Sequence, residues 1–166
     1  ELALCTHFRV LASTATVGLP ETRLGIIPGA GGTYRLPALI GVSRARDMIL
    51  TGRRVGAAEA YFSGLADRLV EIEEDGEGEV GGEGEGKGEG KGLLRRAQEG
   101  ALAEAVRLAG EICKGGPVAV RAALEAVGWA REDVENRMYE RVVGTDDRNE
   151  ALRAFAEKRR PVFSGR

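Results

Sequence analysis

The stretch from residue 18 to residue 33 reads Gly18-Leu19-Pro20-Glu21-Thr22-Arg23-Leu24-Gly25-Ile26-Ile27-Pro28-Gly29-Ala30-Gly31-Gly32-Thr33. It places one carboxylate, Glu21, in a turn bounded by glycine and proline, and it then opens a helix with a glycine-rich loop. A second carboxylate, Glu1, lies twenty residues upstream. Two carboxylates that a turn of chain brings together can serve as general acid and general base. The stretch therefore predicts an acid/base pair.

The length and charge of the chain fit a globular protein with a buried core. Its 166 residues suffice for one domain, or one domain with a tail. The net charge is −2, but residues 73–92 hold eight acidic residues against two lysines. Residues 151–166 are basic, which favours an anionic ligand nearby or marks a solvated helix end. No apolar run approaches the roughly 20 residues that span a bilayer.

The cysteines and the histidine argue against metal and redox chemistry. Cys5 and Cys113 lie in apolar surroundings without metal-ligand or redox spacing, so we interpret them as reduced residues packed in the core. His7 is the single histidine, which argues against a histidine-based triad or zinc site.

Apolar patterning predicts an α/β segment, an insert and a helical C-terminal part. We expect residues 1–6 to end a buried helix, and we expect strands at 8–12, 16–18 and 65–72. Helices are expected at 33–40, 43–50 with Ser43 as N-cap, 56–62, 93–113, 117–130, 131–143 and from 146 to before Pro161. Residues 73–92 contain nine glycines and eight acids, which predicts a disordered insert or, alternatively, an acidic partner-binding segment.

Six ordered blocks resemble the crotonase, or enoyl-CoA hydratase/isomerase, superfamily. They are Glu1-Leu-Ala-Leu-Cys, Gly18-Leu-Pro-Glu-Thr, Gly25-Ile-Ile-Pro-Gly-Ala-Gly-Gly-Thr-Tyr-Arg-Leu, Leu50-Thr-Gly-Arg-Arg-Val, Ala60-Tyr-Phe-Ser-Gly-Leu-Ala-Asp and Ala154-Phe-Ala-Glu-Lys-Arg-Arg-Pro-Val-Phe. Residues 140–152 most resemble the methylglutaconyl-CoA hydratase branch. The resemblance implies an α/β fold: the C-terminal part of a ClpP-like ββα spiral over 1–72, the insert 73–92, and a helical oligomerisation region over 93–166.

The resemblance also implies roles for individual residues. In the hydratases of this superfamily, water attacks the β-carbon of an α,β-unsaturated acyl-CoA while charge flows to the thioester oxygen. By position, Glu1 matches the base toward water, Glu21 the acid/base at the α-carbon, and Gly29 the glycine whose N–H holds the water. Phe155 and Lys158 match positions that reach the adenine and phosphates of coenzyme A. Coenzyme A is part of the substrate, and no separate cofactor or metal is implied.

Each of these residues also has a purely structural interpretation. Glu21 would then be a turn carboxylate paired with Arg23 or Arg35, and Glu1 a frayed terminus. Gly29 would serve only the conformation of a helix-entry loop. Phe155 and Lys158, an aromatic and a cation three residues apart, would lie on one helix face, which suits stacking and charge pairing. In the structural interpretation, Phe155 is a core residue and Lys158 a solvated surface residue.

The functional prediction is hydration of an enoyl-CoA or methylglutaconyl-CoA, in fatty-acid β-oxidation or leucine breakdown. A Δ-enoyl-CoA isomerase, which would need Glu21 alone, is the close alternative. A non-catalytic subunit and an RNA-binding protein are alternatives of another class, and the missing basic-aromatic stripe argues against RNA. The resemblance further implies a trimer or a dimer of trimers, and a mitochondrial rather than peroxisomal location.

The oxyanion hole limits what this chain is expected to do alone. The superfamily forms it from two backbone N–H groups that precede the position of Glu1. We therefore expect the chain to be a fragment of a longer protein. Because one such donor contributes about 3 kcal/mol to transition-state stabilisation, we expect the 166 residues alone to be inactive.

Overall fold

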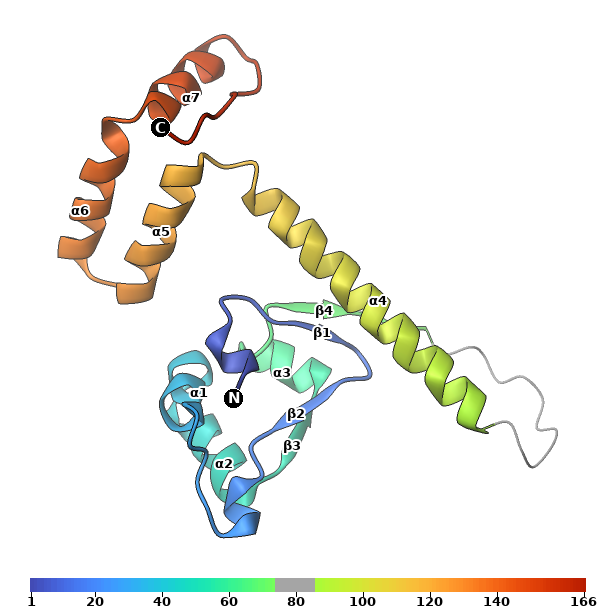
Figure 1. Cartoon of the computed structure of the whole chain (residues 1–166). Helices are drawn as coiled ribbons and strands as arrows, with labels where there is room; N and C mark the ends of the chain where they lie inside the picture. The colour runs from blue at the N-terminus through green and yellow to red at the C-terminus, as the bar shows by residue number, and fades with distance from the viewer. Residues whose placement is uncertain (74–85) are drawn as a thin grey trace. The chain divides into compact units, whose positions relative to one another are not determined.

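Figure 1 shows the computed structural model of the chain, which describes residues 1–73 and 86–166. The described chain forms two compact units, Glu1–Val106 and Arg107–Arg166. The first unit mixes short strands with helices and contains both candidate glutamates, whereas the second is helical.

The strands of the first unit pair in two separate sheets. β1 (Val10–Ala12) runs parallel to β4 (Arg68–Val70), with Leu11 opposite Leu69. β2 (Thr16–Gly18) runs antiparallel to β3 (Arg54–Gly56). The strands expected within 8–12, 16–18 and 65–72 are thus present. The fourth strand, β3, was not predicted, and its last residue, Gly56, was assigned to the helix expected at 56–62.

Helices and turns complete the first unit: η1 (Ala3–Cys5), η2 (Glu21–Leu24), α1 (Gly32–Ile40), α2 (Val42–Thr51) and α3 (Ala57–Ser63). α1 packs against both η1 and α2, and η2 packs against α2. The core beneath these elements consists of buried apolar side chains from Leu19, Leu36, Ile40, Ala45, Met48, Val55, Ala60, Leu65 and Ala66. The core therefore fixes α1 and η2 beside one another on α2, and these two elements hold the site.

Three expectations about local structure were wrong. Residues 1–6 contain only the single turn η1, which has no buried residue, rather than the end of a buried helix. α2 begins at Val42, so Gly41 rather than Ser43 occupies the N-cap. Cys5 and Cys113 are free thiols, but both are exposed and not packed in the core. A three-residue turn has no periodic face to bury, and this explains the exposure of Cys5.

A long helix, α4 (Gly86–Ile112), joins the two units. Its first residues, 86–92, fall in the segment expected to be disordered. Extending an existing helix is easier than nucleating one, which accounts for helix in so glycine-rich a stretch. The rest of the predicted insert that precedes α4 lies outside the described residues, apart from Glu73. Within the first unit, Gly100 lets α4 approach β4 and the residues after it closely, since a Cβ there would lie 3.1 Å from Ile72 Cδ1 and 3.3 Å from Val70 Cγ1.

The second unit is built from the end of α4 and three further helices. α5 (Pro117–Trp129) packs against α6 (Glu132–Val143), and α7 (Asp146–Ala156) follows. Pro117 opens α5 at a position where a missing N–H costs nothing. The Thr145 hydroxyl caps α7 by accepting a hydrogen bond from the Arg148 amide, 3.2 Å away. These helices match those predicted from the sequence to within a few residues at each end.

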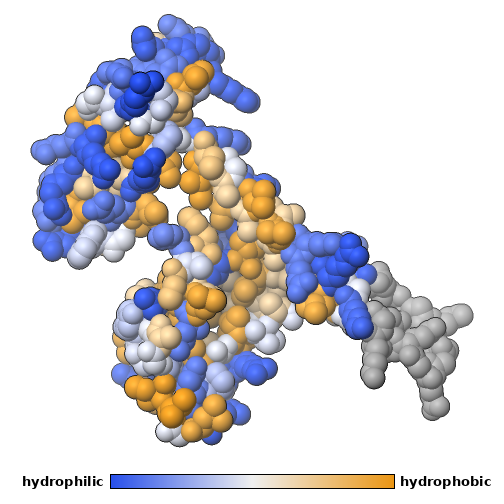
Figure 2. Space-filling view, in the orientation of Figure 1, coloured by the Kyte–Doolittle hydropathy of each residue, from blue (hydrophilic) through white to orange (hydrophobic). Residues whose placement is uncertain are grey.

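Apolar side chains remain exposed on both units (Figure 2). Leu24 is 75 % exposed and Phe62 86 % in the first unit, and Val127 is 77 % exposed in the second. Across residues 1–73 and 86–166, none of the helices combines the length and apolar character that a membrane crossing requires.

Candidate active site

The carboxylate of Glu1 is bound by the backbone of the glycine-rich loop. Its Oε1 accepts hydrogen bonds from the amides of Ala30 and Gly32, both at 2.8 Å. The Gly32 amide is the main reason that the pKa of Glu1 lies below its ordinary value, and the Ala30 and Gly29 amides lower it further. Glu1 is therefore held in its ionised form and is not a frayed end.

Gly32 makes this contact possible because it has no side chain. A Cβ at this position would lie 3.1 Å from Glu1 Oε1, 2.8 Å from Pro28 Cβ and 2.9 Å from Leu19 Cδ1. Gly32 is buried at the start of α1, where backbone N–H groups have no partner within the helix. The helix N-terminus and the missing side chain together form a site for one carboxylate oxygen.

Glu21 is the first residue of η2, and one of its oxygens is unsatisfied. Its Oε2 is buried and has no hydrogen-bond partner among the residues that the structure describes. Neither arginine expected as its partner is paired with it: Arg23 donates to the Thr51 carbonyl at 3.0 Å, and Arg35 donates to the Ala30 carbonyl at 2.9 Å. The ion-pair interpretation of Glu21 is thus wrong. A buried acceptor without a partner is uncommon and calls for an explanation, such as a water or a substrate.

Gly29 is exposed, and its position would tolerate a side chain. Its backbone is not left-handed, and a Cβ would meet only the Ile27 carbonyl oxygen, at 3.9 Å. The loop therefore does not require glycine here for its conformation. Its amide makes the smallest contribution to the lowered pKa of Glu1, whose hydrogen bonds come from Ala30 and Gly32. Any role of Gly29 must accordingly come from the backbone N–H.

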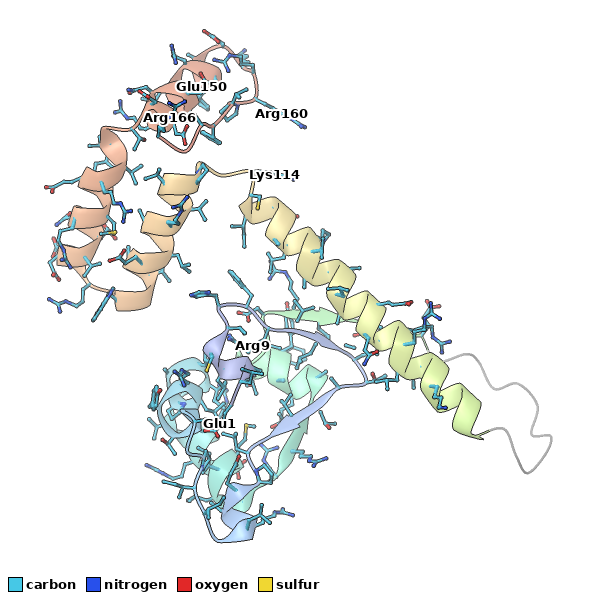
Figure 3. All side chains as sticks on the ribbon, viewed as in Figure 1. Glu1, Arg9, Lys114, Glu150, Arg160 and Arg166 are labelled. Atoms are coloured by element: carbon cyan, nitrogen blue, oxygen red, sulfur yellow. The ribbon has the colours of Figure 1, made fainter. Side chains whose placement is uncertain are left out.

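A cavity of about 630 Å³ is lined by Glu1 but not by Glu21. Glu1 lines it, together with Leu19 and Pro20, the two residues that precede Glu21. The rest of its wall is largely apolar and includes Leu4, Val17 and Leu36. Figure 3 shows Glu1 in the same unit as Arg9, another residue of this wall. The cavity offers an apolar space with a carboxylate at its edge.

Phe155 and Lys158 lie in the other unit and are arranged differently from the sequence expectation. Phe155 is 85 % exposed on α7, so it is not a core residue of the second unit. α7 ends at Ala156, and Lys158 has a left-handed backbone with φ 55°. Lys158 therefore does not share a helix face with Phe155, and the expected three-residue spacing on one face is wrong. The left-handed residue ends the helical repeat.

The site contains no group of metal ligands. In the part of the chain that the structure describes, no three His, Cys, Asp or Glu side chains lie close enough together to hold a metal ion. The two carboxylates and the backbone amides of the loop are the groups available for acid/base chemistry.

Comparison with known proteins identifies the family. Residues 1–75 match the family model described as enoyl-CoA hydratase/isomerase. The chain belongs to the enoyl-CoA hydratase/isomerase, or crotonase, superfamily. It is 66 % identical to "Methylglutaconyl-CoA hydratase 1, mitochondrial" of Pyricularia oryzae, over 100 % of this chain and 47 % of that protein. It is 62 % identical to an enoyl-CoA isomerase/hydratase of Zymoseptoria tritici, over 100 % of this chain and 50 % of that protein.

A solved structure confirms the crotonase fold. The enoyl-CoA hydratase of Bacillus anthracis superposes with a TM-score of 0.77 at 40 % identity, covering 99 % of this chain and 57 % of that one. The expected α/β class and family are thus confirmed. This crotonase chain spans about half the length of the curated relatives that it matches.

Sequence reasoning missed the residues that hold the two glutamates in place. The Ala30 and Gly32 amides bind Glu1, and the Thr22 hydroxyl donates to the Ile49 carbonyl at 2.8 Å beside Glu21. The helix start after a glycine-rich loop did signal an anion site. No local signal indicated that Glu1 itself would occupy it.

Proposed function

We propose that the full-length protein containing this chain hydrates an α,β-unsaturated acyl-CoA thioester, with Glu1 and Glu21 as its acid/base pair. The observation that carries the proposal is the buried Oε2 of Glu21, which has no hydrogen-bond partner within residues 1–73 and 86–166. A buried carboxylate oxygen without a partner is suited to a reacting water or α-carbon, and Pro20, the residue before Glu21, lines the apolar cavity. Family membership supplies the class of reaction.

The proposed chemistry begins with ionised Glu1. It accepts a proton from a water molecule, held also by the Gly29 N–H, as the water oxygen bonds to the β-carbon. The π electrons of the C=C bond move toward the thioester oxygen and form an enolate. Protonated Glu21 then delivers its proton to the α-carbon, which completes the addition of H and OH. Exchange with solvent returns Glu1 to the ionised and Glu21 to the protonated form.

The acyl group proposed first is methylglutaconyl, because a 66 % identical relative carries that substrate in its name. The word mitochondrial in the same name supports a mitochondrial location. A role in leucine breakdown is part of the same proposal. We further propose that the exposed Phe155 ring stacks on the adenine of coenzyme A while Lys158 binds its phosphates. A homotrimer, or a dimer of trimers, is the proposed assembly.

The test is the hydration of methylglutaconyl-CoA and crotonyl-CoA. The reaction is measured as the loss of absorbance of the conjugated thioester. Glu1→Gln and Glu21→Gln in the full-length protein are each expected to lower kcat by about 10²- to 10⁴-fold. Glu71→Gln, at an exposed position of the same unit, is the matched control and is expected to keep full activity. The 166-residue chain, assayed beside the full-length protein, is expected to be inactive.

A Δ-enoyl-CoA isomerase is the second candidate, because another relative is named an isomerase/hydratase. It predicts conversion of a 3-enoyl-CoA that survives Glu1→Gln but not Glu21→Gln. A full-length protein that assembles but turns over none of these thioesters would contradict both catalytic proposals. That result would favour a non-catalytic subunit, and salt-dependent RNA binding by the same preparation would favour an RNA-binding role.

A further inference from the structure

Arg35 reaches back from α1 to the glycine-rich loop that binds Glu1. Its Nη1 donates a hydrogen bond of 2.9 Å to the Ala30 carbonyl. The side chain is half-buried, and among the described residues it forms no ion pair with an acid. Its position is therefore determined by the loop backbone and not by a carboxylate.

Gly31 and Tyr34 border the guanidinium of Arg35. Gly31 has φ 109°, a left-handed conformation that favours glycine, and a Cβ there would overlap Arg35 Nη1. The Arg35 Cζ lies 4.8 Å from the centroid of the Tyr34 ring, in a cation–π arrangement. Glycine at position 31 thus allows the loop conformation and also leaves the space that Arg35 fills.

The carbonyl that Arg35 binds lies between the two amides that bind Glu1. The Ala30 N–H precedes this carbonyl in the same residue. The Gly32 N–H belongs to the next peptide group, which joins Gly31 to Gly32. Both amides point at the same oxygen, Glu1 Oε1, at 2.8 Å. The Ala30 ψ angle sets the direction of this carbonyl, and it also sets the direction of the Gly32 N–H relative to the Ala30 N–H. A hydrogen bond that fixes this carbonyl therefore fixes the convergence of the two amides.

We propose that Arg35 is a positioning residue for the hydration reaction: by holding the Ala30 carbonyl, it keeps the Ala30 and Gly32 amides on the Glu1 carboxylate. The proposal rests on the proposed function, in which Glu1 is the base. In this account, Gly31 and Tyr34 hold the Arg35 guanidinium in the position from which it binds the Ala30 carbonyl. Arg35 does not contact the reacting atoms in this account.

The experiment uses the full-length protein and compares Arg35→Met with the wild type. We expect kcat to fall about tenfold with KM nearly unchanged, because a misplaced base slows the chemical step more than binding. We also expect the acid limb of the pH profile of kcat to move to higher pH. The amides lower the pKa of Glu1, so their displacement lets that pKa rise toward its ordinary value.

Two further variants separate positioning from folding. Arg35→Lys keeps a cation that can donate to the Ala30 carbonyl but loses the planar stacking, so it should recover part of kcat and of the acid limb. Arg46→Met removes an exposed arginine of α2 and should leave kcat, KM and the pH profile unchanged. Thermal unfolding of each variant shows whether it is folded.

The inference is overturned if a folded Arg35→Met variant has the wild-type kcat and acid limb while Glu1→Gln is inactive. It is also overturned if kcat falls with the melting temperature but the acid limb stays in place, since that pattern shows a structural role only. A wild-type protein that hydrates no enoyl-CoA, or a fully active Glu1→Gln variant, overturns the proposed function instead. The two failures are thus distinguishable.

Discussion

The Thr22 hydroxyl donates a hydrogen bond of 2.8 Å to the Ile49 carbonyl, across 27 residues of sequence. Ile49 lies in the last turn of α2, where carbonyl groups have no partner within the helix. One residue further, Arg23 Nε donates to the Thr51 carbonyl at 3.0 Å. The turn that carries Glu21 is therefore fastened to the end of α2 by two side chains that directly follow Glu21.

Thr22→Val should slow catalysis in the full-length protein by loosening this turn. Valine keeps the shape of threonine but cannot donate, so the partly buried Ile49 carbonyl loses its partner at a cost of about 1–3 kcal/mol. We expect a lower melting temperature and a kcat reduced about three- to tenfold, because Glu21 is less well positioned. Thr33→Val, at an exposed position of α1, is the control. Equal kcat in the two variants would contradict a role of Thr22 in positioning Glu21.

Gly32→Ala should expel the Glu1 carboxylate from its amides. The added Cβ would meet Glu1 Oε1 at 3.1 Å as well as the buried Pro28 and Leu19 side chains, at 2.8 and 2.9 Å. We expect a loss of hydratase activity together with a loss of stability of about 1–3 kcal/mol, the usual cost of overpacking. Gly110→Ala makes the same change in an open helical position and should slightly stabilise the protein. Activity and unfolding measured on both variants test the steric argument, and full activity of Gly32→Ala would refute it.

The sequence predicted the elements of the fold better than the contacts of the site. Local patterns indicated most of the helices, and the Gly-Ala-Gly-Gly loop indicated an anion-binding helix start. From the sequence, we expected the Gly29 amide of this loop to hold a water molecule. In the structure, the Ala30 and Gly32 amides of the same loop bind the Glu1 carboxylate. Which anion reaches which amide depends on the packing of η1 against α1, a tertiary contact that no local pattern encodes.

The errors in the sequence analysis have similar causes. Cys5 has apolar neighbours in the sequence, but a single turn leaves it exposed. Lys158 follows Phe155 by three residues, which in a helix would place both side chains on one face. Because α7 ends at Ala156, Lys158 lies outside the helix. Spacing rules hold only while the regular element continues. Here the left-handed backbone of Lys158 ends the helical repeat, and the spacing of Phe155 and Lys158 gives no sign of it.

The ion pair between Arg9 and Asp67 should matter for stability more than surface pairs do. Arg9 is only 8 % exposed; its Nη2 lies 3.0 Å from Asp67 Oδ2, and its Nε and Nη1 donate to the Leu65 and Thr6 carbonyls. Asp67→Asn leaves a buried guanidinium without its counter-charge, and we expect it to destabilise the full-length protein by about 2–4 kcal/mol. Arg9→Met should cost a similar amount.

A double-mutant cycle isolates this pair. Arg9→Met combined with Asp67→Asn should destabilise less than the sum of the two single variants, because the second change removes a group that the first has already left unpaired. Denaturant unfolding of the four proteins gives the coupling free energy. Additive effects would show that the two residues act through their separate backbone contacts.

Glu150 should make the C-terminal segment sensitive to acid. It accepts hydrogen bonds from Arg159 and from the Val162 amide at 3.1 Å, and the Arg159 guanidinium is the main reason that its pKa falls to about 2. A carboxyl whose pKa is lower in the folded state adds stability above its unfolded pKa, near 4.5, and loses it as the pH falls toward 2. We therefore expect the residues after α7 to detach over this range. Hydrogen exchange of the 159–166 amides measures the change.

Glu150→Gln is the variant that tests this assignment. It cannot ionise, so exchange in the segment should already be faster at pH 7 and should depend less on pH between 4.5 and 2. Asp147 holds the same segment through the Ser164 and Gly165 amides at 2.6 and 2.8 Å, and those contacts also lower its pKa. Some acid sensitivity should therefore remain in Glu150→Gln and disappear in the double variant with Asp147→Asn. An unchanged pH dependence in the double variant would show that other carboxyl groups control the segment.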